Sequence, residues 1–267
     1  MNRAAPDGPF DGVPGHLQHG LIHWWRSVAE HSQSGFYAFE VTLRELAAFL
    51  RVNVDPEWDA DELGEYLVAT ATQNDEVMLD LIDGTLRIFG RAAAVDRLVR
   101  LLDLAGSVWT VSPDHLSLVS VVSDESQTIF NASVSVEDEA SGELKVAWAN
   151  AFGRNGNPSD AWDHAIKAME ALFIPLVVPN QTKPNLGHVL GQLRNQGNLW
   201  KMVLPGKDDD NDVAPLASML EGIWPNIDRH QGTVNNRPPT EPEARAVVTL
   251  AATIVQWHRE GWVLQRR

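Results

Sequence analysis

The chain has no cysteine among its 267 residues, so disulfides, zinc sites with thiolate ligands and cysteine nucleophiles are excluded. It also has no hydrophobic run of the length that a membrane span requires. Residues 1–15 are rich in proline, glycine and aspartate, and they lack the apolar core of a signal peptide. From these absences we expect a cytoplasmic protein with no membrane contact.

Basic side chains are scarce. The chain has 21 Lys and Arg against 36 Asp and Glu, which gives a formal net charge of −15. This balance argues against a constitutive coat of nucleic acid or anionic lipid, but it leaves room for a local basic site that touches RNA briefly. No P-loop, dinucleotide-binding, zinc-protease or serine-hydrolase motif occurs. The sequence therefore indicates no cofactor.

Hydrophobic residues make up 44% of the chain, enough for a sizeable core, and many of them recur at helical spacing. In the N-terminal half this spacing predicts helices over residues 17–30, 42–51 and 92–104. Two more are expected to begin after Asp59 and Asn74, which are good helix-capping residues. This part of the chain is therefore predicted to be helical.

Three histidines, His16, His19 and His23, fall three and four residues apart in the first of these segments. They can share one helix face, which is metal-ligand spacing in principle. No fourth ligand is evident, and a solvated face is the more frequent use of such a pattern. We therefore predict no metal site.

The character of the sequence changes after Gly106. Residues 108–111 and 116–122 are apolar and β-branched, and they predict a small β-hairpin. Residues 123–139 are polar and fit either a helix or an extended arm. The predicted divisions are a tail with a short helix over 1–35, a helical N-terminal domain over 36–106, a hairpin and linker over 107–140, and a helical bundle over 141–267.

Apolar side chains at helical spacing resume in the C-terminal part. Ser159 is the expected N-cap of the strongest helix there, and Pro175 is expected to end it. The predicted fold class is mainly α, with two helical domains joined by a small β-hairpin. The long helices of the bundle are predicted over residues 143–152, 160–173, 212–224 and 241–260.

A polar cluster, Asn226, Asp228, Arg229 and His230, lies between the last two of these helices. The junction of two core helices is a place where a helical domain can hold a site. The alternative is structural: Arg229 and His230 could cap helix ends and bind Asp228 or Glu170.

Four blocks of the C-terminal half occur in a familiar order: residues 147–161, 165–172, 182–187 and 228–232, the last reading Asp-Arg-His-Gln-Gly. In this order they resemble the abortive-infection C-terminal-like domain found in many actinobacterial proteins. The resemblance covers about residues 107–267.

Such domains are similar to HEPN-type helical domains, many of which are metal-independent ribonucleases that act as dimers. Their motif is an arginine followed four to six residues later by a histidine, at the start of the last long helix. The histidine is the general acid/base at the RNA 2′-hydroxyl, and the arginine stabilises phosphorane charge. His230 occupies the histidine position. The expected arginine is absent, since the preceding positions hold Asn226 and two apolar residues, so Arg229 and Arg154 are the candidate cations.

The resemblance implies a phage-defence effector of the abortive-infection type that acts as a metal-independent endoribonuclease. The alternatives are a non-catalytic HEPN-like module that recognises a protein, nucleotide or RNA partner, and a sensor whose N-terminal domain does the recognising. It also implies a homodimer through the C-terminal bundle, where Trp257 and Trp262 would contribute. The candidate site residues are His230, Arg229 and Asn226 for catalysis, and Arg154, Lys183, Asp228 and Glu170 for substrate binding.

Overall fold

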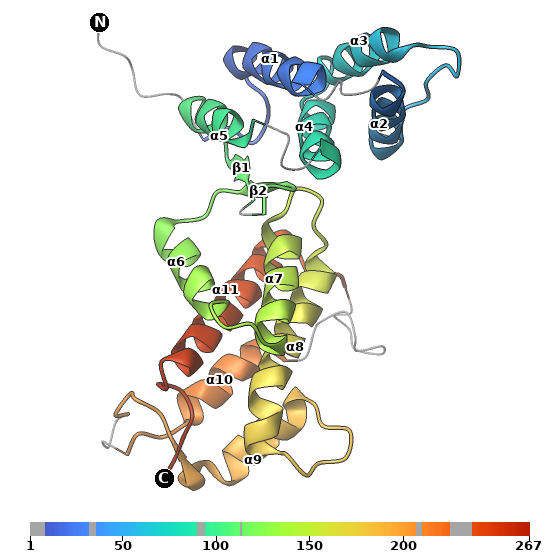
Figure 1. Ribbon diagram of the computed structural model, residues 1–267. Coiled ribbons are helices and arrows are strands. Elements are labelled where there is room, and N and C mark those ends of the chain that lie inside the picture. Colours follow the sequence, from blue (N-terminus) through green and yellow to red (C-terminus); the bar gives the residue numbers. More distant parts are fainter. Residues whose placement is uncertain (1–8, 32–35, 90–93, 113, 207–209, 225–236) are drawn as a thin grey trace, which may run out of the picture. The chain divides into compact units, whose positions relative to one another are not determined.

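The computed structural model is mainly helical, which confirms the predicted fold class at this level (Figure 1). Its described part contains eleven α-helices and two small antiparallel sheets. The chain divides into two compact units, Met1–Val121 and Val122–Arg267. The structure describes residues 9–31, 36–89, 94–112, 114–206, 210–224 and 237–267.

The N-terminal unit packs five helices around a core that includes Leu17, Trp24, Leu43, Leu63 and Met78. The antiparallel pair of strands that follows them is β1 (Trp109–Val111) and β2 (Leu118–Ser120). The helices are α1 (Gly15–His31), α2 (Phe36–Phe49), α3 (Ala60–Ala71), α4 (Asp75–Phe89) and α5 (Val95–Leu104).

Only some helices of this unit begin at the capping residues that the sequence predicts. Asp59 caps α3 by accepting hydrogen bonds from the next backbone N–H groups, and the side chain of Glu62 bonds back to Asp59, as the sequence predicts. The predicted start at Thr42 is wrong, because α2 begins at Phe36. Phe39 is buried one turn before Leu43, so it extends the apolar stripe and the helix with it.

The β-hairpin belongs to the N-terminal unit and is not part of a separate linker. Val111 and Leu118 lie in the core of this unit. The backbone N–H of Leu118 donates a 2.6 Å hydrogen bond to Asp83, a buried carboxylate of α4. Phe10, which the sequence places in a tail, pairs with Ser107 beside the hairpin. The boundary between the units therefore falls after Val121.

The C-terminal unit is built around α11. This helix packs against α6, α7 and α8, and its buried face runs from Ala244 to Val255 (Figure 1). The elements of this unit are α6 (Asp124–Ser133), α7 (Glu139–Phe152), α8 (Pro158–Val177), α9 (Leu186–Asn195), η2 (Gly197–Leu199), β3 (Trp200–Lys201), α10 (Ala214–Ile223), α11 (Glu241–Arg259) and β4 (Gln265–Arg266).

The predicted long helices of the bundle are present, with shifted ends. Residues 124–133 form a helix, which settles the segment left open by the sequence. Asn157, and not Ser159, caps α8, because its side chain accepts from two backbone N–H groups and Pro158 fits the first helical position. Pro175 does not end α8. The helix continues to Val177, so Pro175 removes one backbone hydrogen bond in the last turn without ending the helix.

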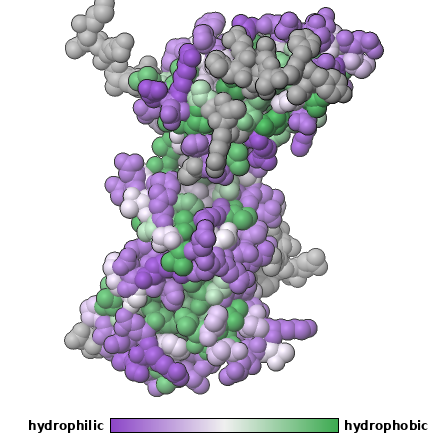
Figure 2. Space-filling model, in the orientation of Figure 1, coloured by the Kyte–Doolittle hydropathy of each residue, from purple (hydrophilic) through white to green (hydrophobic). Residues whose placement is uncertain are grey.

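Hydrophilic residues cover most of the face seen in Figure 2, and hydrophobic residues gather at the lower end of the C-terminal unit. None of the described helices combines the length and the apolar character needed to cross a membrane.

Candidate functional site

Four of the predicted site residues, Asn226, Asp228, Arg229 and His230, lie outside the described residues. The described chain stops at Trp224 and resumes at Arg237. The two flanks of this segment and the predicted residues that the structure describes define the candidate site.

The first flank is the end of α10. The buried indole Nε1 of Trp162 donates a 2.6 Å hydrogen bond to the carbonyl oxygen of Ile223, the last residue of α10. Trp162 lies in the second turn of α8, so this bond fastens the end of α10 to the beginning of α8. A terminal carbonyl that the helix cannot satisfy thus finds a side-chain donor.

The second flank is the start of α11. Thr240 and Glu243 form a capping box, and Arg237 adds an ion pair with Glu243 at 2.5 Å. The hydrogen bond from Arg237, followed by those from Thr240, lowers the pKa of Glu243 to about 2. Glu243 is therefore charged at neutral pH, where a carboxylate in the first turn also suits the helix dipole.

The start of α11 is bound to the end of α7. The Nε of Arg245, in the second turn of α11, donates to the carbonyl oxygen of Ala151 at 3.1 Å. The guanidinium of Arg245 also lies over the ring of Phe152, 5.8 Å from its centroid. Both flanks of the segment are therefore attached to the α7–α8 hairpin, at the end where the chain turns.

Arg154 lies in that turn, half-buried between α7 and α8. The turn is tight, because a β-carbon at Gly156 would collide with the backbone oxygen of Asn150. Of the predicted substrate-binding residues that the structure describes, Arg154 is the one that shares its end of the hairpin with both flanks.

Glu170 and Lys183 lie towards the other end of α8. Glu170 accepts a 2.9 Å hydrogen bond from the backbone N–H of Leu186, so it caps the start of α9. Lys183 is exposed in the connection to α9 and adopts a positive φ of 51°. Glu170 follows Pro158 by twelve positions, which is about 18 Å along the helix. The structure thus does not bring Glu170 and Lys183 together with Arg154.

One pair of titratable side chains was not found from the sequence. The Nδ1 of His164 on α8 lies 2.5 Å from the Oε2 of Glu143 on α7, and the two side chains are 24% and 27% exposed. The Asn157 N–H donates to the side chain of Asn150 at 3.1 Å across the turn. Glu143 and His164 each lie seven residues further from the turn. Two helical turns keep a residue on the same face, so this spacing is a signal that could have predicted the pair.

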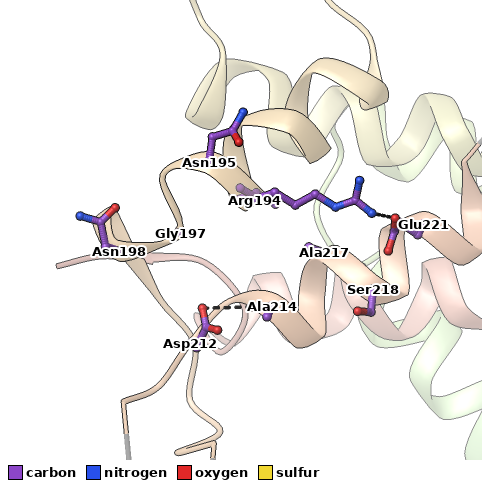
Figure 3. Close-up of a pocket in the computed structure, with 10 residues that line it drawn as sticks. Arg194, Asn195, Gly197, Asn198, Asp212, Ala214, Ala217, Ser218 and Glu221 are labelled. Carbon is purple, nitrogen blue, oxygen red and sulfur yellow. Dashed lines mark hydrogen bonds and ion pairs between the residues drawn. The ribbon is translucent and has the colours of Figure 1, made fainter.

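A polar pocket of about 470 Å³ opens between α9 and α10 (Figure 3). An ion pair between Arg194 and Glu221 spans it, and Asp212 accepts a 3.2 Å hydrogen bond from the backbone N–H of Ala214. Its lining contains none of the predicted site residues. We therefore do not assign it to the site.

The described residues contain no group of three or more His, Asp or Glu side chains placed to hold a metal ion. Among the predicted histidines, His16 contacts the carbonyl of Ala105 at 3.4 Å, and His23 contacts Arg97 at 3.4 Å. Both histidines therefore make their contacts within the N-terminal unit, from α1.

The far end of α11 is fixed by a charged contact. Arg259 binds Asp138, the N-cap of α7, through two bonds of 2.7 and 2.8 Å. The hydrogen bond from Arg259 lowers the pKa of Asp138. Next to Arg259, burial lowers the pKa of His258, and the Arg259 charge adds to this effect. The imidazole of His258 meets the ring of Phe173 edge-on, with centroids 5.9 Å apart.

This arrangement predicts a pH dependence of stability. Because the folded-state pKa of His258 is below its ordinary value of 6.5, the unfolded chain binds the proton more readily. The stability of the C-terminal unit should therefore be greatest above pH 6.5 and should fall as the pH drops towards the folded-state pKa. Urea unfolding at a series of pH values measures the slope. In His258→Gln this slope should flatten, and an unchanged slope would contradict the assignment.

No protein-family model, curated protein or solved structure matches the chain.

Proposed function

We propose that this chain is an effector of the abortive-infection type, a metal-independent endoribonuclease that acts as a homodimer. One observation carries the proposal. Trp162 holds the end of α10 and Arg245 holds the start of α11, both at the end of the α7–α8 hairpin that bears Arg154. The segment that contains His230 thus has both of its anchors beside a cation.

The proposed chemistry needs a base, an acid and a charge stabiliser. His230 takes the proton from the RNA 2′-hydroxyl, whose oxygen attacks the adjacent phosphorus. The bond from phosphorus to the 5′-oxygen breaks, the leaving oxygen takes a proton from solvent, and the products are a 2′,3′-cyclic phosphate and a 5′-hydroxyl. Arg229 and Arg154 are the candidates to stabilise the phosphorane charge, with Asn226 and Asp228 as neighbouring polar groups.

The positions of Glu170 and Lys183 reduce the number of candidate site residues. Glu170 caps α9, and both residues lie towards the other end of α8, so neither belongs to the proposed catalytic group. The net charge of −15 argues against a general basic surface that would assist RNA binding. The local cations must therefore do so, and we expect RNA contact to be brief.

Expression in bacterial cells tests this function. The wild-type chain should arrest growth and fragment total RNA, and His230→Ala should do neither at an equal level of protein. Growth arrest with intact RNA would rule out ribonuclease activity. It would favour the alternative, a HEPN-like module that acts by binding a partner. Normal growth with intact RNA at high expression would contradict the proposal.

A further inference from the structure

Two helices of the C-terminal unit bring a histidine and a carboxylate together in the groove of the α7–α8 hairpin. The Nδ1 of His164 lies 2.5 Å from the Oε2 of Glu143. The two side chains are 24% and 27% exposed, so the groove is open to solvent at this pair. The proposed ribonuclease chemistry uses neither residue.

The contact leaves one nitrogen of the imidazole available. A carboxylate at Nδ1 holds the proton of the neutral ring on that nitrogen, so Nε2 carries the lone pair. Within the described part of the chain, Nε2 of His164 has no hydrogen-bond partner. Glu143 also fixes the orientation of the ring. An oriented imidazole with a free lone pair at the solvent boundary is a nucleophile.

A cation lies one helical turn further along α8. Lys167 follows His164 by three positions, so the two side chains share one face of the helix. Lys167 is exposed, and none of the described carboxylates pairs with it. Asp160 is exposed one turn on the other side of His164, towards the start of α8. A negatively charged group bound at Nε2 would therefore be attracted towards Lys167 and repelled from Asp160.

We propose that Nε2 of His164 is a phosphorylation site that accepts a phosphoryl group from an acyl phosphate. The lone pair of Nε2 attacks phosphorus, the bond from phosphorus to the acyl oxygen breaks, and a carboxylate leaves with that electron pair. A carboxylate leaves without a proton, so the transfer needs no general acid.

The two neighbours of His164 have separate roles in this transfer. Glu143 accepts the Nδ1 proton as positive charge develops on the ring. Lys167 stabilises the negative oxygens of the phosphoryl group, which is the main demand of phosphoryl transfer. The chain has a net charge of −15, so a phosphoryl donor needs such a local cation in order to approach. Both neighbours are positioning residues, since the new bond forms on His164 alone.

Incubation of the purified full chain with acetyl phosphate tests this site. The protein should gain the mass of one phosphoryl group, in a linkage that acid hydrolyses and alkali leaves intact, as a bond from phosphorus to nitrogen requires. Fragment mass spectrometry of the wild type should place the group on His164.

A parallel incubation distinguishes the two sources of an acyl phosphate. It uses a response-regulator receiver domain that carries an aspartyl phosphate and has been freed of acetyl phosphate. Transfer from the receiver domain would identify a protein as the donor, and transfer from acetyl phosphate alone would identify a small molecule. Either result supports the site.

The variants separate the acceptor from its neighbours. His164→Gln should abolish phosphorylation, and the matched control His19→Gln, at an exposed histidine of α1, should retain it. Glu143→Gln keeps the shape of the side chain but cannot take the proton, so phosphorylation should slow by about 10²-fold. Lys167→Ala should also slow it, and Lys167→Arg should restore the rate because it restores the charge.

Any of three results would overturn the assignment: no transfer from either donor, a phosphoryl group on a residue other than His164, or an unchanged rate in Glu143→Gln. Misfolding of His164→Gln, which far-UV circular dichroism would detect, does not affect the test, because the position of the group is mapped in the wild type. The measurement uses no RNA, so its outcome is independent of the proposed ribonuclease activity.

Discussion

Replacing Met169 with aspartate should unfold the C-terminal unit. Met169 lies in the middle of α8 with no exposed surface, inside the core that α7, α8 and α11 share. A carboxylate there has no room for water, and burying it without a partner costs at least about 3 kcal/mol, beside the lost packing of the methionine. Since whole domains are stable by only about 5–15 kcal/mol, this loss should be decisive. Thermal unfolding followed by circular dichroism measures it.

The control for this substitution is Ala149→Asp, which introduces the same side chain on an exposed position of α7. Its free energy of unfolding should change by no more than about 1 kcal/mol. A soluble Met169→Asp protein with the melting temperature of the wild type would show that the core of this unit is assigned incorrectly.

The second large effect is expected at His230. In the purified chain, His230→Ala should reduce the rate of RNA cleavage by about 10²–10⁴-fold, the usual contribution of a general acid/base. The melting temperature should stay unchanged, because the role is chemical. The matched control is His19→Ala, an exposed histidine of the N-terminal unit, which should retain the full rate. Equal rates for His230→Ala and the wild type would remove His230 from the mechanism.

The helices could be predicted because the apolar spacing that marks them is also the spacing that packs them. In α11, Val247, Val248, Ala251 and Val255 recur at three- and four-residue intervals and are all buried. The ends of helices were less predictable, because several residues compete for a cap. Asn157 is the N-cap of α8 in place of Ser159, since with this cap Pro158 occupies the first turn of the helix.

The site could be predicted only in part, because tertiary distances do not follow from a list of polar residues. Glu170 was grouped with Arg154 from the sequence, yet the length of α8 separates them. The pair His164 and Glu143 needed a different argument, which is the symmetry of an antiparallel hairpin about its turn. The anchors at Trp162 and Arg245 could not be foreseen either, since a single hydrogen bond to a distant carbonyl leaves no pattern in the sequence.

We propose that this chain cleaves RNA without a metal. The most direct measurement incubates the purified full chain with a structured RNA in the presence of EDTA and analyses the ends of the fragments. We expect cleavage that yields 2′,3′-cyclic phosphate and 5′-hydroxyl ends, because the 2′-hydroxyl is the proposed nucleophile. RNA that stays intact under all conditions, or cleavage that EDTA abolishes, would contradict it.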